Sequence, residues 1–534
     1  MSLFLIAIYA VCGVYMILNF KHDIHMLQQN SYRISRYWKY LKNDIGSTWR
    51  LVDVALLFLT FATLLDIRLA LLIVAMACAT KIFLILKKKF KKPLVFTKRV
   101  WRIYTVTTIL AVACFLTAIL CTLHKTDIWG GYSPAQVSVG TLLLITVFSW
   151  AVVILAVILL TPVEKSINMK YWKEASAILK SMPDLKVIGI TGSYGKTSTK
   201  HYLDRILDEQ FEVLMTPGSY NTPMGVIRTV REMMKPYHQI FICEMGAKQT
   251  GDIKEICDLV HPQIGIITAV GPMHLESFKT MENVQSTKFE LADALPADGL
   301  AVVNNDFEYC ADRPVKNVKC IRYCLGQNQD GACAYYADNI RYTPFGTTFK
   351  VHAPNGEEFE LQTKLVGACN ISNLLGAVVV ARYLGMEWQT IARAVAQIEQ
   401  VEHRLSIKRT PGGITIIDDA FNSNPSGSKM ALEVLSGFTE GKRIIVTPGM
   451  IELGSRQEEL NEEFGKNIAK CVDIAVVVGE YNRDSILKGI RKEGMQDENL
   501  YAVSSFNEAQ KLLEGLLKSG DTVLYENDLP DSFK

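Results

Sequence analysis

A short glycine-containing turn and the lysine after it are the residues with the clearest chemistry in this sequence. An apolar stretch that ends at Ile190 leads into a predicted helix, and the positions suited to hold phosphate are Gly192, Ser193, Gly195, Lys196, Thr197 and Ser198. Backbone N–H groups at a helix start bind anions, and glycines let phosphate oxygens come close. Lys196 would neutralise terminal phosphates, and the Thr197 hydroxyl would ligate Mg²⁺. The pattern predicts an ATP site; the alternative is a tight turn without a ligand.

The turn departs from the usual phosphate-loop pattern at one position. That pattern places a glycine five residues before the final one, where this chain has Ile190. Only the shorter run Gly192-x-x-Gly195-Lys196-Thr197 remains, so the sequence predicts an ATP site of an unusual kind.

Other residues that could do chemistry follow apolar, strand-like runs or lie near them. Glu244 ends one run and could be a second oxygen ligand for Mg²⁺ or an ordinary loop glutamate. His274 could be a ligand or a structural histidine, and Lys288 taken alone would be a solvated helix lysine. Asp418 and Asp419 close a further strand and could form a metal site, contact a ribose or start a turn.

The excess of apolar residues in this 534-residue chain is concentrated before residue 162, and the chain has material for three or four domains. The hydrophobic content is 49%, and the apolar stretches are Leu3–Phe20, Leu51–Leu65, Leu69–Leu86, Ile103–Leu123 and Val137–Leu160. Each is near the roughly 20 residues that span a bilayer. We therefore expect an all-α transmembrane domain of about five helices over residues 1–162. Its first stretch lacks the flanks of a signal peptide and is interpreted as an anchor.

Basic residues predict the orientation of these helices. The loops at residues 21–50 and 87–102 are rich in lysine and arginine, whereas the link at residues 124–136 has one lysine. Basic loops stay in the cytoplasm, so we expect a multi-pass protein of the cell membrane with its N-terminus outside and its catalytic domains cytoplasmic. The net charge of +3 gives no argument for nucleic acid as a partner, and the basic loops suit anionic membrane lipids.

The remainder of the chain has the pattern of an α/β protein. Residues 163–184 are polar with helical spacing and are expected to form a linker helix. From residue 185 strand-like runs alternate with helical ones, which predicts largely parallel sheets. A break near Gln400–Arg404 separates a central ATP-binding domain at 185–400 from a smaller, Rossmann-like domain at 401–534. The segment Cys320–Leu361 is expected to be an antiparallel insertion.

The order of these motifs resembles the Mur ligase family, most closely the branch that adds D-alanyl-D-alanine in peptidoglycan synthesis. The matching pieces cover about half of the chain and are Ile190–Lys200, Asn221–Gly225, Glu244–Ala247, His274–Glu276, Lys288, Asn304–Asp306, Gly367–Asn373, His403–Arg404, Asp418–Pro425 and Met450–Gly454. The resemblance implies a P-loop-type central domain and an ATP-dependent ligase of cell-wall biosynthesis that forms amide bonds.

The resemblance also implies roles for single residues. Thr197 and Glu244 would hold one of two Mg²⁺ ions, and His274 would help to hold the second, together with a carbamylated Lys288. The catalytic residues would be Lys196, His274 and Lys288, and the nucleotide would also be contacted by Asn304, Arg404 and Asp419. ATP would convert a carboxylate into an acyl phosphate, and the amine of an amino acid or dipeptide would then attack it.

Departures from the family pattern lie nearer the amine substrate. They occur at Lys248, Gln249, Cys369, Phe421, Gly449 and the tail after Tyr525. The family's domain for the UDP-sugar has no room between Leu160 and Leu185. The acceptor is therefore expected to be a lipid-linked cell-wall precursor or polymer, and a UDP-linked precursor is the alternative.

Two other functions stay open. One is a membrane transporter or energy-coupled machine with a cytoplasmic ATPase domain. It is disfavoured because the spans carry few charges beyond Asp53, Asp66, Arg68 and Lys81. The other is a catalytically inactive scaffold, which the presence of the ATP and metal residues disfavours.

Overall fold

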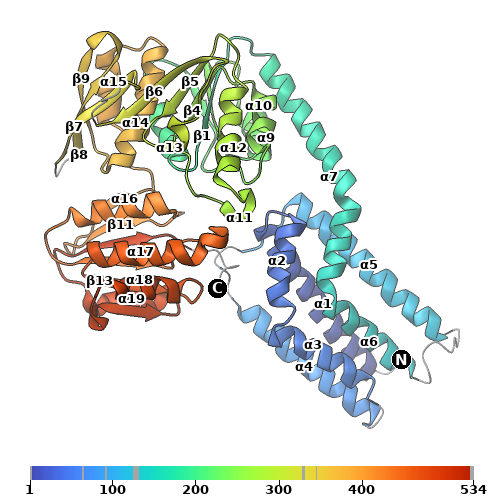
Figure 1. Ribbon diagram of the computed structural model, residues 1–534. Coiled ribbons are helices and arrows are strands. Elements are labelled where there is room, and N and C mark those ends of the chain that lie inside the picture. The colour runs from blue at the N-terminus through green and yellow to red at the C-terminus, as the bar shows by residue number, and fades with distance from the viewer. Residues whose placement is uncertain are drawn as a thin grey trace. The chain divides into compact units, whose positions relative to one another are not determined.

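The computed structural model describes residues 3–62, 65–88, 90, 93–123, 132–326, 331–343, 346–421 and 423–528. Most of the expected external link, residues 124–131, lies outside these ranges. The chain divides into two compact units, one that ends at Met169 and a larger one that begins at Lys170. Figure 1 shows a first unit built of helices and a second unit that contains the strands.

Helices alone build the first unit. They are α1 (Leu3–Gln29), α2 (Ile34–Asp44), α3 (Thr48–Thr60), α4 (Ile67–Lys87), α5 (Lys98–Leu123), α6 (Pro134–Val147) and α7 (Ser149–Lys180), the last of which continues into the second unit. Within the described residues, α1, α4, α5 and α7 are long and apolar enough to cross a membrane. The all-helical character of this region and its approximate helix count agree with the sequence prediction.

Two of the predicted spans differ from the structure. The stretch Leu51–Leu65 forms only the 13-residue α3, and Val137–Leu160 is divided at Phe148 into α6 and α7. Both α3 and the 14-residue α6 are shorter than the roughly 20 residues of a full span. They pack against each other instead. The residues expected to form a linker helix continue α7, which runs through Pro162 to Lys180.

Buried ion pairs join the helices of this unit. The Arg50 guanidinium donates a 2.6 Å hydrogen bond to Asp23, and the Ser149 hydroxyl donates to the same carboxylate. The Lys81 ammonium pairs with Asp53. A buried charge is stable only with a partner, so each pair ties two helices together. The break before α7 places Ser149 where it can complete the first network.

The first sheet of the second unit has the strand order β2-β3-β1-β4-β5-β6-β7-β8-β9. Its strands are β1 (Lys186–Thr191), β2 (Val213–Met215), β3 (Ile240–Glu244), β4 (Ile264–Ile267), β5 (Leu300–Asn304), β6 (Lys319–Leu325), β7 (Tyr335–Thr343), β8 (Gly346–His352) and β9 (Glu358–Thr363). The expectation of an antiparallel insertion at Cys320–Leu361 was wrong in part. Strand β6 is parallel to both β5 and β7, and only the β7–β8 and β8–β9 pairs are antiparallel. This segment extends the sheet rather than interrupting it.

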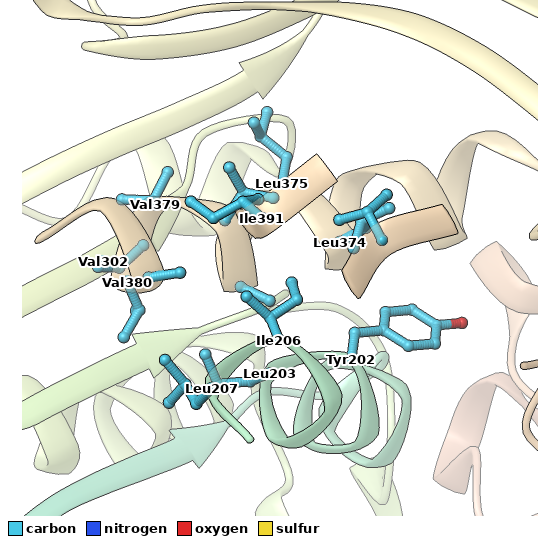
Figure 2. Packing of buried hydrophobic residues seen from close by; sticks show 14 of the residues in the cluster. Tyr202, Leu203, Ile206, Leu207, Val302, Leu374, Leu375, Val379, Val380 and Ile391 are labelled. Atoms are coloured by element: carbon cyan, nitrogen blue, oxygen red, sulfur yellow. The ribbon is translucent and has the colours of Figure 1, made fainter. Parts of the chain in front are cut away.

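Helices cover both faces of this sheet. One face packs on α8 (Lys196–Leu207), α14 (Ala368–Tyr383) and α15 (Trp388–Ala396), and the other on α9 (Pro223–Met233), α10 (Asp252–Val260) and α12 (Met281–Asp293). Figure 2 shows α8 meeting α14 and α15 through side chains that include Tyr202, Leu203, Ile206, Leu207, Leu374, Leu375, Val379, Val380 and Ile391. Each buried aliphatic side chain contributes about 1.5–3 kcal/mol, so the start of α8 is rigidly placed. The short helices α11 (Leu275–Phe278) and α13 (Glu308–Ala311) and the 3-10 turn η2 (Pro354–Gly356) complete this part.

The second sheet has the order β10-β11-β15-β12-β13-β14. Its strands are β10 (Ser406–Arg409), β11 (Thr415–Asp419), β12 (Arg443–Thr447), β13 (Ile474–Val478), β14 (Leu500–Val503) and β15 (Thr522–Glu526). All pairs are parallel except β10–β11. The helices are α16 (Pro425–Ser436), α17 (Gln457–Cys471), α18 (Arg483–Lys492) and α19 (Phe506–Leu516), with 3-10 turns η3 (Gly454–Arg456) and η4 (Asp497–Asn499). The predicted α/β class with two largely parallel sheets is confirmed.

Candidate active site

The predicted phosphate turn lies between β1 and the N-terminus of α8. Gly192 has a φ of 152° and Gly195 a φ of 77°. A Cβ on Gly195 would lie 2.1 Å from Oδ1 of Asn373, and one on Gly192 would lie 2.1 Å from Oγ1 of Thr268. Side chains at these positions would clash, so the turn requires both glycines. It opens onto the first turn of α8, where backbone N–H groups favour an anion.

The missing glycine at Ile190 has a structural explanation. Ile190 lies inside β1, is fully buried and pairs with Glu244 of β3 and Ile266 of β4. The turn begins only after Thr191, so the shorter motif is sufficient. Ser193 fastens this turn, because its hydroxyl lies 3.0 Å from the Gly271 carbonyl oxygen and can donate to it.

Lys196 is folded back over the turn. Its ammonium donates a hydrogen bond of 2.7 Å to the carbonyl of Gly192 and a longer one of 3.3 Å to that of Ser193. Burial lowers the pKa of Lys196 to about 8, with Arg404 acting in the same direction and Glu244 opposing it. Lys196, the side-chain cation of the turn, is thus held beside the start of α8 and loses its proton at a lower pH than an ordinary lysine.

Glu244 is the centre of a buried polar cluster at the end of β3. Its carboxylate accepts hydrogen bonds from Lys200 at 3.0 Å, from Asn221 at 3.0 Å and from the Thr197 hydroxyl at 3.1 Å. Burial alone would raise the pKa of Glu244, but Lys200 and Lys196 hold it below its ordinary value. The carboxylate therefore stays ionised in an almost fully buried position.

Lys288 is a buried lysine that forms no ion pair with an acid among the residues that the structure describes. It is 3% exposed on α12, and its ammonium lies 5.9 Å from the centroid of the Phe278 ring. Burial lowers the pKa of Lys288 well below its ordinary value, and Lys196 adds to this effect. Asp252 and Glu290 act in the opposite direction, and the net effect is an amine that loses its proton more readily than that of an ordinary lysine. The simple interpretation of Lys288 as a solvated helix lysine was wrong.

His274 follows β4 and is the residue before α11, with a left-handed φ of 54°. Its Nδ1 is hydrogen-bonded to the carboxylate of Glu452, a residue of the loop between β12 and η3. Burial lowers the pKa of His274, which Glu452 opposes, and Lys288 adds to the lowering. The imidazole is thus fixed in direction by a residue 178 positions away in the sequence.

The three further residues expected to contact the nucleotide lie on different parts of the chain. Asn304 ends β5 and is buried, and its side-chain N–H groups donate to Thr268 and Ser372 at 2.9 Å. Arg404 stacks on the Phe421 ring at 4.1 Å and is drawn toward Asp419. Burial raises the pKa of Asp419 to about 6. Asn304 thus links Thr268, which follows β4, to Ser372 of α14, whereas Asp419 ends β11 of the second sheet and Arg404 lies just before β10.

Electrostatic influence connects most of these residues into one site. The charges of Glu244 and Arg404 shift the pKa of Lys196, and the charge of Lys196 shifts that of Lys288. Lys288 in turn shifts the pKa of His274, and Asp419 shifts that of Arg404. Of the other predicted residues, Ser193 braces the turn and Ser198 is buried in the first turn of α8. The structure therefore gathers the predicted catalytic, metal and nucleotide residues around the phosphate turn.

The side chains of Thr197 and Glu244 suit one Mg²⁺ ion as they are, whereas the expected second ion, near His274, involves a modified Lys288. Thr197 and Glu244 offer a hydroxyl and a carboxylate, which are the hard oxygen ligands that Mg²⁺ prefers. Among the described residues no group of three or more His, Cys, Asp or Glu could hold a metal ion. A second ion would therefore need a further anionic oxygen near His274. The Glu452 carboxylate beside His274 offers one such oxygen, and the amine of Lys288 would offer another if it were carbamylated.

Three residues of this site were missed by sequence reasoning. Lys200 lies one helical turn after Lys196, and this spacing could have indicated that both lysines lie on the same face of the helix. Glu526 ends the apolar strand β15 and pairs in register with Asp419, just as Glu244 ends β3. The contact of Glu452 with His274 has no local signal, because only the fold brings them together.

Comparison with known proteins gives consistent matches to this part of the chain. Residues 190–381 match the Mur ligase middle domain, and residues 403–525 match the family described as Mur ligase, glutamate ligase domain. The chain is 28% identical over 352 residues to the UDP-N-acetylmuramoyl-tripeptide--D-alanyl-D-alanine ligase of Bacillus subtilis, covering 64% of this chain and 72% of that protein.

Solved structures agree with the sequence matches. The crystal structure of MurF from Acinetobacter baumannii superposes with a TM-score of 0.61 and 25% identity, over 68% of this chain and 77% of that one. MurF from Thermotoga maritima in complex with ADP has a TM-score of 0.60 at 24% identity, over 68% and 80% of the two chains.

Proposed function

The chain belongs to the Mur ligase family, and from this premise we propose that it is a membrane-anchored cell-wall ligase that works through an acyl phosphate. Family membership makes it an ATP-dependent enzyme that joins a carboxylate to an amine, like its curated relatives. The observation that supports the proposal most is the cluster of Lys196, Thr197 and Glu244 at the phosphate turn, because it unites a cation, a hydroxyl and an ionised carboxylate.

The proposed reaction has two steps. A carboxylate oxygen of the acceptor attacks the γ-phosphorus of ATP, so that ADP leaves and an acyl phosphate forms. The amine of an amino acid or dipeptide then attacks the acyl carbon, and the resulting tetrahedral intermediate loses phosphate and a proton. Lys196 and the N-terminus of α8 stabilise negative charge on the phosphoryl group during transfer. Bound Mg²⁺, held at Thr197 and Glu244, would neutralise phosphate charge.

Lys288 is proposed to carry a carbamate. Its neutral amine would attack CO₂ and form an N-carboxylate with loss of a proton, which converts a buried base into an oxygen ligand. The lowered pKa of Lys288 supports this chemistry, since a protonated amine cannot react. The carbamate and His274 would then hold a second Mg²⁺.

The acceptor is proposed to be a lipid-linked muramoyl peptide. The curated relatives are named for a UDP-linked tripeptide and for D-alanyl-D-alanine. In this chain apolar helices precede the ATP-binding part, and α1, α4, α5 and α7 have membrane-spanning length. We propose that they anchor the enzyme with its N-terminus outside and its catalytic part in the cytoplasm. Anchoring confines the enzyme to the layer that holds lipid-borne substrates and raises their effective concentration.

The test supplies the full chain, in phosphatidylcholine nanodiscs, with ATP, Mg²⁺ and D-alanyl-D-alanine. Either UDP-N-acetylmuramoyl tripeptide or the same tripeptide on a lipid diphosphate is added, and products are identified by mass spectrometry. We expect amide formation with both and a higher kcat/KM for the lipid-linked acceptor. Equal or better use of the UDP-linked form would overturn the lipid proposal. ATP hydrolysis without need of either substrate would favour an energy-coupled machine instead.

A further inference from the structure

A small groove lies between the start of α5 and the middle of α7, within the helical unit. It has a volume of about 130 Å³ and is lined by Arg99, Ile103, Val157, Leu160, Thr161, Glu164, Lys165 and Asn168. Its residues divide into an apolar floor and a polar rim. The floor consists of Ile103, Val157 and Leu160, which are at most 9% exposed.

The groove lies where both helices change from polar to apolar sequence. On α5 the basic residues Lys98, Arg99 and Arg102 precede the apolar run that begins at Ile103. On α7 the apolar run ends at Leu160, and charged residues begin at Glu164. In a membrane helix this change marks the depth of the lipid headgroups. The polar rim is therefore at the level of lipid phosphates if α5 and α7 span the bilayer.

Arg99 of the rim and the neighbouring Arg102, which does not line the groove, are held in place by an acid and an aromatic ring. Arg102 donates a 2.7 Å hydrogen bond to Glu164. Arg99 lies 3.8 Å from the same carboxylate, which is too far for a hydrogen bond, and stacks on the Tyr32 ring at 4.2 Å. The Arg99 Nε is buried and has no hydrogen-bond partner among the described residues. Arg99 is thus oriented but keeps donor capacity.

The charge of the rim favours a dianion. Among the residues that line the groove, Arg99 and Lys165 are positively charged and Glu164 is negatively charged. Arg102 lies outside the lining but pairs with Glu164 and offsets its charge, so two positive charges remain in excess at the groove. A diphosphate diester carries two negative charges, whereas the phosphodiester of an ordinary anionic phospholipid carries one. Below the rim, α5 and α7 expose apolar side chains such as Ile109, Val112, Leu155, Ile158 and Leu159, which suit a hydrocarbon chain.

We propose that this groove binds the diphosphate group of a membrane lipid, with the lipid chain lying along the exposed apolar faces of α5 and α7. The inference rests on the proposed membrane insertion and deepens the proposed lipid-linked acceptor, because it gives that acceptor a binding site in the helical unit. Arg99 and Lys165 would contact the phosphate oxygens, and Glu164 would keep the two arginines in position.

The test measures binding of farnesyl diphosphate to the full chain in phosphatidylcholine nanodiscs. An Arg99→Gln/Lys165→Gln variant removes both cations that line the groove. The matched control is Lys170→Gln, which removes an exposed charge from α7 outside the groove. Loss of charge-assisted contacts should weaken binding of farnesyl diphosphate roughly tenfold or more in the double variant, with the control unchanged. ATP binding should be equal in all three proteins, which verifies that they are folded.

Each alternative outcome has a definite meaning. Unchanged binding in the double variant would overturn the proposal. Equal competition by phosphatidylglycerol would show a general headgroup surface, and equal binding of inorganic pyrophosphate would show that no lipid chain is recognised; either would also overturn it. If the double variant still prefers the lipid-linked acceptor in the ligation assay, this site is wrong and the proposed function stands. If farnesyl diphosphate binds as expected but no lipid-linked product forms, the site stands and the proposed function fails.

Discussion

Lys200 is a fully buried lysine on α8 whose ammonium contacts both Glu244 and the carbonyl of Gly218. Replacing it with methionine keeps the apolar stem but leaves the Glu244 carboxylate without its cation. The Lys200→Met variant should raise the pKa of Glu244, weaken Mg²⁺–ATP binding and lower the free energy of unfolding by about 3–5 kcal/mol. Titration calorimetry with Mg²⁺–ATP and thermal denaturation measure the two effects.

Lys254 provides the matched control for Lys200. It forms an ion pair with Asp258 on the surface of α10, where both side chains are more than half exposed. Such pairs contribute about 0.2–1 kcal/mol, so Lys254→Met should change neither stability nor nucleotide affinity appreciably. Wild-type Mg²⁺–ATP affinity in Lys200→Met would contradict the role assigned to Lys200.

Lys196 should make nucleotide binding depend on pH. Its pKa of about 8 in the free enzyme means that the positive charge is present below this value and lost above it. ATP affinity should therefore fall as pH rises through about 8. Lys196→Met should bind ATP weakly at every pH and form no amide product, because no other side chain of the turn carries a positive charge. Near-normal turnover in this variant would exclude the phosphate-turn assignment.

Lys288 should require carbon dioxide for activity. Removing CO₂ and bicarbonate should lower the ligation rate, and adding bicarbonate should restore it. Lys288→Ala should be nearly inactive but partly rescued by acetate or formate, because a small carboxylate can occupy the space of the carbamate. NMR with ¹³C-labelled CO₂ detects the modified amine directly. A fully active enzyme with an unmodified Lys288 would contradict the proposal.

Several residues were predictable because their chemistry depends on local sequence. Gly192 and Gly195 combine with Lys196 in one turn, and Glu244 stands at a strand end where parallel strands place functional groups. The contact between His274 and Glu452 was not predictable in the same way, since two separate sheets must first form to bring the residues together. Nor does local sequence reveal that Lys288 is buried on α12.

At the scale of elements, strand positions were easier to predict than membrane helix boundaries. Buried parallel strands appear in the sequence as short apolar runs between polar turns, which fixes their positions closely. A long apolar stretch such as Val137–Leu160 contains no polar turn that would mark the end of a helix. It divides at Phe148 because the buried carboxylate of Asp23 binds Ser149 at the start of α7, and this contact depends on the folded bundle.

The ends of β11 and β15 bring two acids together, and this pair should destabilise the protein as pH rises. Asp419 and Glu526 are in register, and burial raises the pKa of Glu526 well above its ordinary value. The folded state then binds more protons than the unfolded state, so stability falls as pH rises above the ordinary glutamate pKa of about 4.5. Glu526→Gln removes this titration, and its unfolding midpoint should vary less between about pH 5 and pH 8.

The control for this prediction is Glu458→Gln, on the exposed side of α17. It should leave the pH dependence of the unfolding midpoint as in the wild type, because its side chain is in solvent. An equally steep loss of stability in Glu526→Gln would show that the titration of Glu526 does not cause the pH dependence.

At the scale of the whole molecule, a ligase and a set of apolar helices are parts of one chain, and this union has a kinetic consequence. An anchored enzyme meets a lipid-linked acceptor by diffusion in two dimensions, so the rate depends on the surface density of the acceptor rather than its bulk concentration. Adding inert phosphatidylcholine at a fixed amount of acceptor should therefore lower the ligation rate in proportion to the dilution of the surface. With the UDP-linked acceptor, which is dissolved in water, the same addition should change nothing. A rate with the lipid-linked acceptor that is insensitive to surface dilution would mean that the enzyme takes its substrate from solution, and the helices would then need another explanation.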